Sequence, residues 1–458
     1  MAEHNVTVES TLTTLLDEKK YPTVRDILIT MNPSDVASIL DELPEERLPL
    51  LFRLLPKEQA AETFVEMEPE AQELLIRGFS DSELREVLDE LYVDDAVDIV
   101  EEMPANVVRR ILSQADPQMR KEINEILRYP ENSAGSIMTT EYVSLRPGMT
   151  VEESILRIRR TGVDKETIYT CYVTRDRTLV GLVTVKDLLL AQDDDMKIEE
   201  LMETNVISVN THTDQEDVAQ MFAKYNFLAL PVVDAESRMV GIITFDDAMD
   251  VMEVEATEDM EIMGGMTPSD KTYLRSTVFD LFKHRIPWLL LLMVSATFTG
   301  LIITNFESAL AAQVALTAFI PMLMDTGGNS GSQSSVTVIR AISLDEIEFS
   351  DLPRIVWKEI RTAVLCGATL AAACFVKIML VDRLLMRNDS ITVTVAVVVC
   401  ITMALTVLIA KIIGAVLPMC AKKIGLDPAV MASPFITTIV DALSLLIYFG
   451  VATTLLPM

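Results

Sequence analysis

Five long apolar segments after residue 283 constrain this chain more than any other feature. They lie at about 286–303, 310–338, 363–381, 391–416 and 430–456. Each reaches or nearly reaches the roughly 20 apolar residues that a helix needs to cross the hydrocarbon core of a bilayer. One such segment could be a buried helix of a soluble protein. Five in succession predict an all-α transmembrane domain with five helices.

The excess of acidic residues is confined to the part of the chain before these segments. Residues 284–458 hold 11 Lys and Arg and 11 Asp and Glu, so the whole net charge of −31 belongs to residues 1–283. Phosphate binding needs clustered Lys and Arg, which excludes nucleic acid as a partner and disfavours an anionic lipid surface. An acidic surface attracts cations, although most of these carboxylates are expected simply to be solvated.

Basic residues in the short loops predict the orientation of the apolar helices. They gather on the side of the N-terminus, with Lys283 and Arg285 before the first segment and Lys422 and Lys423 between the last two. The opening MAEHNVTVES has neither the basic nor the apolar region of a signal peptide. The cysteines show no metal-binding or disulfide spacing. We therefore expect a multi-pass protein of the plasma (inner) membrane, with a cytoplasmic N-terminal half and an external C-terminus.

Asp441 interrupts the last apolar segment, where an ionised side chain is costly. Ser433, Thr437, Asp441 and Ser444 follow one another at spacings of four, four and three residues, which places them on one face of a helix. A protonated Asp could hydrogen-bond to a neighbouring helix and act only as structural glue. The polar stripe around it favours the alternative, in which the carboxylate faces an aqueous path.

The second apolar segment contains the polar motif PMLMDTGGNSGSQSS, residues 321–335. Its Asp325, Asn329 and Gln333 recur every four residues and so share a helix face. The glycines of the motif would let another backbone, or a hydrated ion, come close. A packing seam between helices explains the glycines but not the three stacked oxygen-bearing side chains, whereas a polar lining explains both.

The chemistry of these side chains favours a hard cation. Oxygen donors without a nearby thiolate or imidazole suit such an ion. A few carboxylates among many hydroxyl and carbonyl oxygens suit Mg2+, which gives up its water reluctantly. The residues themselves leave Na+ and H+ open.

An internal repeat occupies residues 137–255. IMTTEYVSLRPGMTVEES resembles LMETNVISVNTHTDQEDV 64 residues later, and GLVTVKD resembles GIITFDD 60 residues later. The two copies resemble a tandem pair of CBS domains, an α/β regulatory module. Many CBS pairs bind adenine nucleotides through the Thr and Asp of this turn, here Thr184 with Asp187 and Thr244 with Asp247. Others serve only as dimerisation scaffolds, and the resemblance leaves the choice open.

Residues 20–130 alternate short amphipathic helices with prolines at positions 44, 56, 69, 104 and 117. Proline suits the first turn of a helix, and short helices that cannot bury a face alone are expected to stack into a small superhelix. The acidic stretch YVDDAVDIVEEMP, residues 92–104, is interpreted as a solvated face. The segment 253–285 either transmits motion to the apolar helices or is a passive linker.

Together, these parts in this order resemble the MgtE family of magnesium transporters, and FIPMLMDTGGNSGSQSS and DPAVMASPFITTIVDALSLLIYF carry the resemblance most specifically. The resemblance implies an all-α superhelical N-terminal domain at 1–132 and CBS domains at 133–197 and 198–255. It further implies a connecting (plug) helix at 256–283 and a transmembrane domain with five helices at 284–458.

The resemblance also implies a homodimeric Mg2+ channel whose second and fifth transmembrane helices line one pore. Asp441 would meet its symmetry mate and bind hydrated Mg2+, assisted by the backbone oxygen of Thr437, with Gly328 and Asn329 near the path. Abundant cytoplasmic Mg2+ would bridge acidic residues and close the pore. The regulatory candidates, carried over by position, are Asp95, Glu216, Asp247, Asp250, Glu255, Glu258, Asp259 and Asp427.

Two other functions stay open at this point. One is an ion-coupled carrier of Mg2+, Co2+ or Mn2+, and the other is a membrane-anchored nucleotide or cation sensor without transport. The sequence contains no GxxxxGK[ST] P-loop and no local catalytic pattern, so no enzyme is predicted. The expected ligands are Mg2+, as permeant and regulatory ion, and an adenine nucleotide at the CBS pair.

Overall fold

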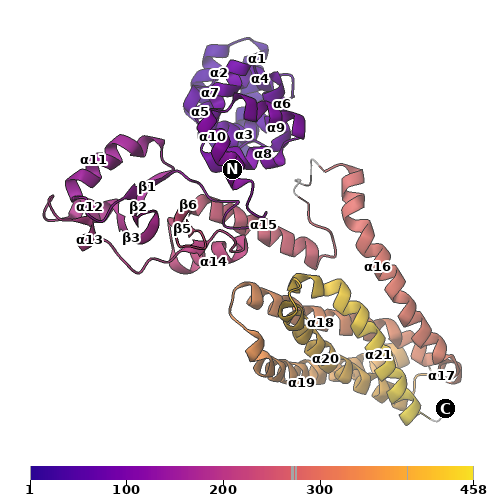
Figure 1. Ribbon diagram of the computed structural model, residues 1–458. Coiled ribbons are helices and arrows are strands. Elements are labelled where there is room, and N and C mark those ends of the chain that lie inside the picture. Colours follow the sequence, from indigo (N-terminus) through magenta and orange to yellow (C-terminus); the bar gives the residue numbers. More distant parts are fainter. Residues whose placement is uncertain (1, 270–272, 274–275, 389, 457–458) are drawn as a thin grey trace. The chain divides into compact units, whose positions relative to one another are not determined.

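The computed structural model describes residues 2–269, 273, 276–388 and 390–456. The chain divides into two compact units, Met1–Met252 and Glu253–Met458 (Figure 1). Each unit has a hydrophobic core of its own.

The N-terminal part of the first unit is a stack of short helices. Their bounds are α1 (Ala2–Asp17), α2 (Tyr21–Leu28), α3 (Pro33–Glu42), α4 (Leu48–Phe52), α5 (Lys57–Val65), α6 (Pro69–Gly78), α7 (Asp81–Leu88), α8 (Val93–Glu102), α9 (Ala105–Gln114) and α10 (Pro117–Ile126). Helix α3 packs on α5, α5 on α7 and α7 on α9, so alternate helices form a continuous row. This arrangement confirms the predicted all-α stack.

Prolines mark the starts of several of these helices, because a fixed φ and a missing N–H cost little there. Pro69 and Pro117 lie in the first turns of α6 and α10, and Pro56 and Pro104 are the N-caps of α5 and α9. The expectation for Pro44 is wrong. It precedes a turn, and the next helix begins only at residue 48.

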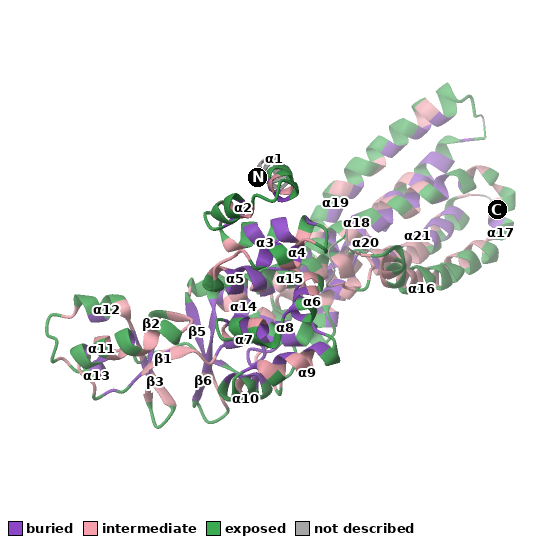
Figure 2. Ribbon diagram, turned by 90° about the horizontal axis from the view of Figure 1, so that it is seen from above, coloured by how far each residue is buried: buried purple, intermediate pink, exposed green. Residues whose placement is uncertain are grey.

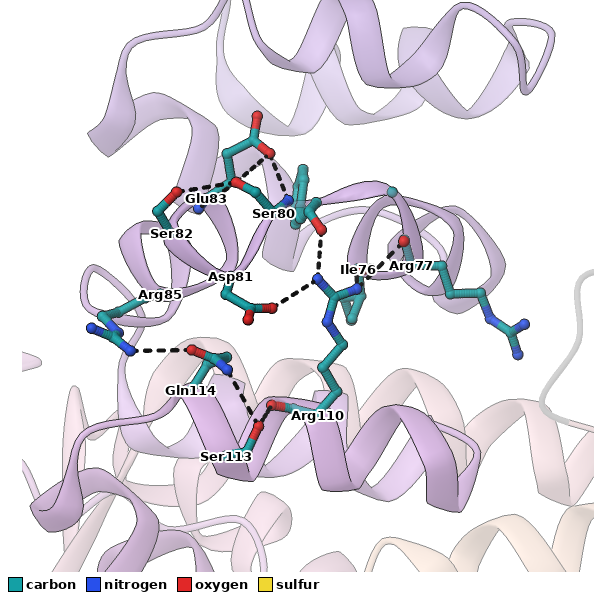
Figure 3. Close-up of polar contacts among 12 residues, drawn as sticks. Ile76, Arg77, Ser80, Asp81, Ser82, Glu83, Arg85, Arg110, Ser113 and Gln114 are labelled. Atoms are coloured by element: carbon teal, nitrogen blue, oxygen red, sulfur yellow. Dashed lines mark hydrogen bonds and ion pairs between the residues drawn. The ribbon is translucent and has the colours of Figure 1, made fainter.

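Polar contacts between the helices fix the stack (Figure 3). Arg110 of α9 donates hydrogen bonds to the carbonyl oxygens of Ile76 and Phe79, at the C-terminal end of α6. These carbonyls have no partner within the helix, and a guanidinium satisfies them. Arg53, which follows α4, forms an ion pair of 2.7 Å with Glu83 of α7, whose pKa falls to about 2 because Arg53 and Ser80 hydrogen-bond to it.

Two small sheets follow in the first unit. Their elements are β1 (Tyr142–Leu145), α11 (Val151–Thr161), β2 (Thr167–Arg175), β3 (Thr178–Thr184), α12 (Val185–Leu190), α13 (Ile198–Leu201), β4 (Val209–Asn210), α14 (Gln215–Tyr225), β5 (Ala229–Val233), β6 (Met239–Thr244) and α15 (Phe245–Met263). In each sheet the first strand pairs parallel with the second, which pairs antiparallel with the third. The equal topologies confirm the repeat, and the buried Tyr172, Met239 and Ile242 form a core that joins the copies.

The second unit consists of helices. After the end of α15 come α16 (Val278–Asn305), α17 (Glu307–Ala312), the 3-10 helix η2 (Val314–Phe319), α18 (Ile320–Ser343), the 3-10 helix η3 (Phe349–Asp351), α19 (Leu352–Lys377), the π-helix η4 (Ile378–Leu385), α20 (Val393–Lys423), the 3-10 helix η5 (Pro428–Met431) and α21 (Ser433–Leu455). Helix α20 packs against α18, α19 and α21, and α18 also packs against α21. Helix α16 has no buried residue and contacts α21 (Figure 2).

Four stretches of the described chain are long and apolar enough to cross a membrane: Val278–Asn305, Phe349–Leu385, Val393–Lys423 and Pro428–Leu455. Helix α18 is outside this group, although it packs among these helices. The Asp, Asn, Gln, Ser and Gly residues of its motif lower its mean hydropathy. A fifth crossing, by α18, therefore remains a prediction.

Candidate functional site

Helix α18 has a packed face made of its glycines. A Cβ atom on Gly327 would lie 2.6 Å from Cγ2 of Thr406 in α20 and 2.9 Å from Oγ of Ser444 in α21. On Gly328 it would lie 2.6 Å from Cγ2 of Thr437 in α21. Real Cβ contacts are longer than this, so α18 can approach both helices only with glycine at these positions. The glycines are therefore a packing seam.

The other face of α18 carries the predicted oxygen stripe. Asp325, Asn329 and Gln333 are all exposed in the second unit, while the glycines are buried. The packing-seam interpretation is therefore confirmed for the glycine face, and the polar lining remains a prediction for the exposed face. A stripe of charged and amide side chains among membrane helices is stable only against water, ions or another protein surface.

Asp441 lies on α21 beside this stripe. Its carboxylate is close enough to that of Asp325 for the two charges to repel each other. The Asp441 Oδ1 atom is buried and has no hydrogen-bond partner among the described residues. Thr437, one turn earlier, meets Gly328. The structure therefore brings together Asp441, Thr437 and Gly328, and it adds Asp325, which the sequence placed in the motif but not in the site.

A second group of carboxylates lies in the first unit. We call this group the acidic cluster. It comprises Asp94 and Asp95 of α8, Glu141 and Glu166 near the starts of β1 and β2, and Asp246 and Asp247 at the start of α15. These residues are widely separated in the sequence. They meet because the helical stack and the second CBS copy share one hydrophobic core.

Burial and mutual repulsion raise the pKa values of this cluster. The pKa of Asp95 rises to about 7, mainly because the side chain is buried and secondly because the negative charge of Asp247 is near. Burial and Asp95 raise the pKa of Glu166 to about 8. The pKa of Asp247 rises only to about 6, because the hydrogen bonds from Thr244 offset part of the effect of its burial. Among the residues that the structure describes, no basic side chain lines the adjoining cleft of about 400 Å³, to which Asp95, Glu166 and Asp246 contribute.

The acidic cluster fits a hydrated cation better than a tightly chelated one. Asp94 is 6% exposed, and its Oδ1, like Oε2 of Glu166, is buried without a hydrogen-bond partner in the described part of the chain. Within those same residues, no three carboxylate, imidazole or thiol groups converge closely enough to hold one bare metal ion. Mg2+ usually keeps several waters and uses one or two carboxylates, which suits a cluster in which no three carboxylates converge among the described residues.

The sequence found only part of the acidic cluster. Asp95 and Asp247 were predicted regulatory residues, and Asp250 also acts on Asp247 through its charge. The interpretation of residues 92–104 as a solvated face is wrong for Asp94, which is buried. Glu216 lies in the first turn of α14 and accepts a hydrogen bond of 3.3 Å from Gln220.

A third group of carboxylates lies at the membrane end of α15, within the second unit. Burial and the charge of Asp427 raise the pKa of Asp259, and Glu255 adds to this effect. Ser343 of α18 donates a 3.4 Å hydrogen bond to Asp259. Asp427 is the N-cap of η5, the turn that leads into α21. Three of the predicted regulatory residues therefore meet beside the ends of α18 and α21, and the fourth, Glu258, precedes Asp259 on α15.

The predicted nucleotide residues form the same Thr-to-Asp hydrogen bond in both CBS copies, and in the first copy Thr184 is the N-cap of α12. The Thr184 hydroxyl donates a 2.5 Å hydrogen bond to Asp187, and the Thr244 hydroxyl donates one of 2.5 Å to Asp247. Their surroundings differ. Thr184 lines an apolar cleft of about 480 Å³, together with Tyr169, Thr170, Val185, Lys186, Leu189, Leu190 and Leu228. Thr244 is buried, and its partner belongs to the acidic cluster.

Comparison with known protein families assigns each part of the chain. The family described as a divalent cation transporter matches residues 320–451. The MgtE intracellular N domain matches residues 31–132, and the CBS domain matches residues 134–194 and 198–254.

Individual relatives agree over almost the whole chain. It is 37% identical to the magnesium transporter MgtE of Thermus thermophilus, across 96% of this chain and 97% of that protein. It is 33% identical to the magnesium transporter MgtE of Bacillus subtilis, across 96% and 95%. A crystal structure of the cytosolic domain of the Mg2+ channel MgtE in complex with ATP is 40% identical, covers 53% of this chain and 99% of that one, and gives a TM-score of 0.51.

Proposed function

Because this chain belongs to the MgtE family of magnesium transporters, whose members are transporters and channels rather than enzymes, we propose that it is a Mg2+-selective channel. In this proposal it imports Mg2+ across the plasma membrane and is closed by cytoplasmic Mg2+. The N-terminal and CBS parts are cytoplasmic, α18 is the fifth crossing, and the C-terminus is external.

The exposed stripe of α18 is the observation that carries the pore assignment. Asp325 and Asn329 cannot face lipid at low cost. Asp441 lies near Asp325, and its Oδ1 has no hydrogen-bond partner among the described residues. A second copy of the chain placed against this stripe would enclose it and double its carboxylates. The homodimer would then hold one central path, in which Asp441, Thr437 and Asn329 contact a hydrated ion and Gly328 allows the close approach of the helices.

The acidic cluster supports closure by cytoplasmic Mg2+. Without a cation, the charges of Asp95, Glu166 and Asp247 repel one another and destabilise the packing of α8 on the second CBS copy. A hydrated Mg2+ between them removes this repulsion. At the membrane end of α15, a second ion would act in the same way on Glu255, Asp259 and Asp427 and fix that helix beside α18 and α21.

The CBS pair supports a nucleotide site in its first copy. The cleft at Thr184 offers an aromatic and aliphatic surface for a base and Lys186 for a phosphate. The ATP complex of the related cytosolic domain agrees with this chemistry. We do not extend the proposal to Thr244 as a phosphate contact, because the neighbouring carboxylates would repel the anion.

Single-channel recording from excised patches tests the proposal. Mg2+ is the only external permeant cation, and Mg2+ at the cytoplasmic face is stepped from micromolar to ~10 mM, a range that includes weak, flexible sites. We expect unitary currents that vanish as cytoplasmic Mg2+ rises. Asp441→Asn should abolish them, whereas the matched control Asp345→Asn, on an exposed side chain near Lys422, should leave them unchanged.

Each other outcome is informative. Unitary currents that do not change with cytoplasmic Mg2+ would support the pore but refute closure by cytoplasmic Mg2+. Uptake into cells without any unitary current would indicate a carrier. Mg2+ uptake that survives Asp441→Ala would refute the assignment of the path.

A further inference from the structure

Three polar side chains from three helices meet inside the transmembrane bundle. Lys411 of α20 is 5% exposed, and its Nζ donates a 3.3 Å hydrogen bond to Oγ of Ser334 in α18. The Ser334 hydroxyl in turn donates a 2.7 Å hydrogen bond to Oε2 of Glu359 in α19. We call this chain the Lys411–Ser334–Glu359 bridge. Of the three, only Ser334 belongs to the polar motif at 321–335.

The bridge lies beside a very close crossing of α18 and α20. A Cβ atom on Gly414 would overlap the backbone carbonyl of Gly331, so α18 and α20 touch through their backbones there. Lys411 is three residues before Gly414, and Ser334 is three residues after Gly331. Lys411 therefore extends from α20 close to a backbone contact between α18 and α20 at which the two helices cannot shift past each other.

The direction of the hydrogen bonds is fixed by chemistry. An ammonium group can only donate, so the Ser334 oxygen accepts from Lys411 and its proton is left for the Glu359 carboxylate. Intramembrane lysines are rare and usually face a bundle interior with a partner. Removing one member of such a pair leaves the other charge uncompensated, which costs more than removing both.

The bridge lies on the side of α18 opposite its exposed stripe. At 3.6 residues per turn, Ser334 and Asp325, nine residues apart, lie on opposite sides of the helix. Holding Ser334 against α19 and α20 therefore directs Asp325 away from them. Asn329 is also exposed on that outward side.

We propose that the Lys411–Ser334–Glu359 bridge sets the rotation of α18 about its axis and so determines how Asp325 and Asn329 face the permeating ion. Lys411 and Glu359 are positioning residues, and neither contacts the ion. This inference rests on the proposed Mg2+ path.

The test compares Lys411→Met, Glu359→Gln, Ser334→Ala and the double variant Lys411→Met with Glu359→Gln, by unitary Mg2+ conductance in patches. Each single change should lower the conductance of the channels that open by about 2–30-fold, the range for residues that couple to a site without touching its ligand. The double variant should stay as low as the single variants, because Ser334 then has neither partner; recovery toward wild type would show that an uncompensated charge, and not loss of the bridge, lowers the conductance. Lys377→Met is the matched control, since it removes another lysine of the bundle, paired with Asp382 at 2.8 Å.

A second readout does not depend on conduction. In an Asn329→Cys background in which the native cysteines are replaced by Ala, the rate of labelling by a charged thiol reagent should change when Lys411→Met is added and should not change with Lys377→Met. If the single variants only reduce the amount of folded channel, with wild-type unitary conductance and labelling rate, the bridge is structural and the inference is wrong. If the wild-type protein conducts no Mg2+ but the labelling rate still shifts, the proposed function fails and the bridge stands.

Discussion

Replacing Asp95 by Asn should stabilise α8 when Mg2+ is absent. A pKa that moves from 3.8 to about 7 corresponds to about 4 kcal/mol of unfavourable free energy when the carboxylate is ionised. The pKa of Asp95 is higher in the folded state than its ordinary value. The folded protein is therefore most stable with respect to this group below about pH 4, where Asp95 is neutral, and loses that stability as the pH rises through about 7. At about pH 8, the wild-type protein therefore carries the whole cost, whereas an amide at position 95 carries no charge.

Hydrogen exchange of the peptide that covers Val93–Glu102 measures the local stability of α8 in the full-length protein. At pH 8 in EDTA, Asp95→Asn should slow the exchange of its amides by up to about 1,000-fold, which is the equivalent of 4 kcal/mol. The difference should shrink toward pH 4, and it should shrink in ~10 mM Mg2+, because a hydrated ion pairs with the wild-type carboxylates. Asp89→Asn, on an exposed residue at the end of α7, is the control and should change nothing.

Faster exchange in Asp95→Asn than in wild type, at pH 8 without Mg2+, would refute the reasoning. It would mean that the carboxylate stabilises α8 through its contacts and that repulsion within the acidic cluster is not the dominant effect. An equal response of both proteins to Mg2+ would remove Asp95 from the sensor.

Three further changes test other parts of the molecule. Asp247→Ala with Asp250→Ala should shift closure of the channel to higher cytoplasmic Mg2+, because two charges that bind the ion are lost; unchanged inhibition in patches would exclude them from the sensor. Gly414→Ala should lower the thermal stability of the bundle by about 1–3 kcal/mol through overpacking, and Gly300→Ala, where nothing lies within 4 Å of the new Cβ, should not. Tyr169→Ala should weaken ATP binding at the CBS pair in equilibrium dialysis while Asp247→Ala spares it; equal loss in both variants would contradict a nucleotide site confined to the first copy.

The parts of the fold that sequence reasoning predicted are those whose signal is local. The apolar runs, the repeat of the CBS copies and the proline-bounded short helices can each be recognised within a few dozen residues. Helix α18 shows where hydropathy alone fails, because the polar residues of its motif also remove its hydropathy signal. Its two faces become distinct only when Gly327 packs on Thr406 and Ser444 of other helices.

Contacts between distant segments explain the rest of what was missed. Asp94 sits in an acidic stretch that resembles any solvated helix face, and only the shared core with the second CBS copy buries it. Lys411 and Glu359 are 52 positions apart on neighbouring helices, and they become partners only through Ser334 of a third. No spacing rule within one segment could have paired them.

The two copies of the Thr–x–x–Asp turn show why even a recognised motif does not fix a function. In both, the Thr hydroxyl donates a 2.5 Å hydrogen bond to the Asp carboxylate. In the first copy the cap opens onto an apolar cleft with a lysine, which suits an anion with an aromatic base. In the second, the charge of Asp247 acts on Asp95 of the packed helical stack, which suits a cation. In the proposed function, the neighbouring elements and not the motif decide the charge of the ligand, so that duplication of one turn would supply both a nucleotide site and a metal sensor.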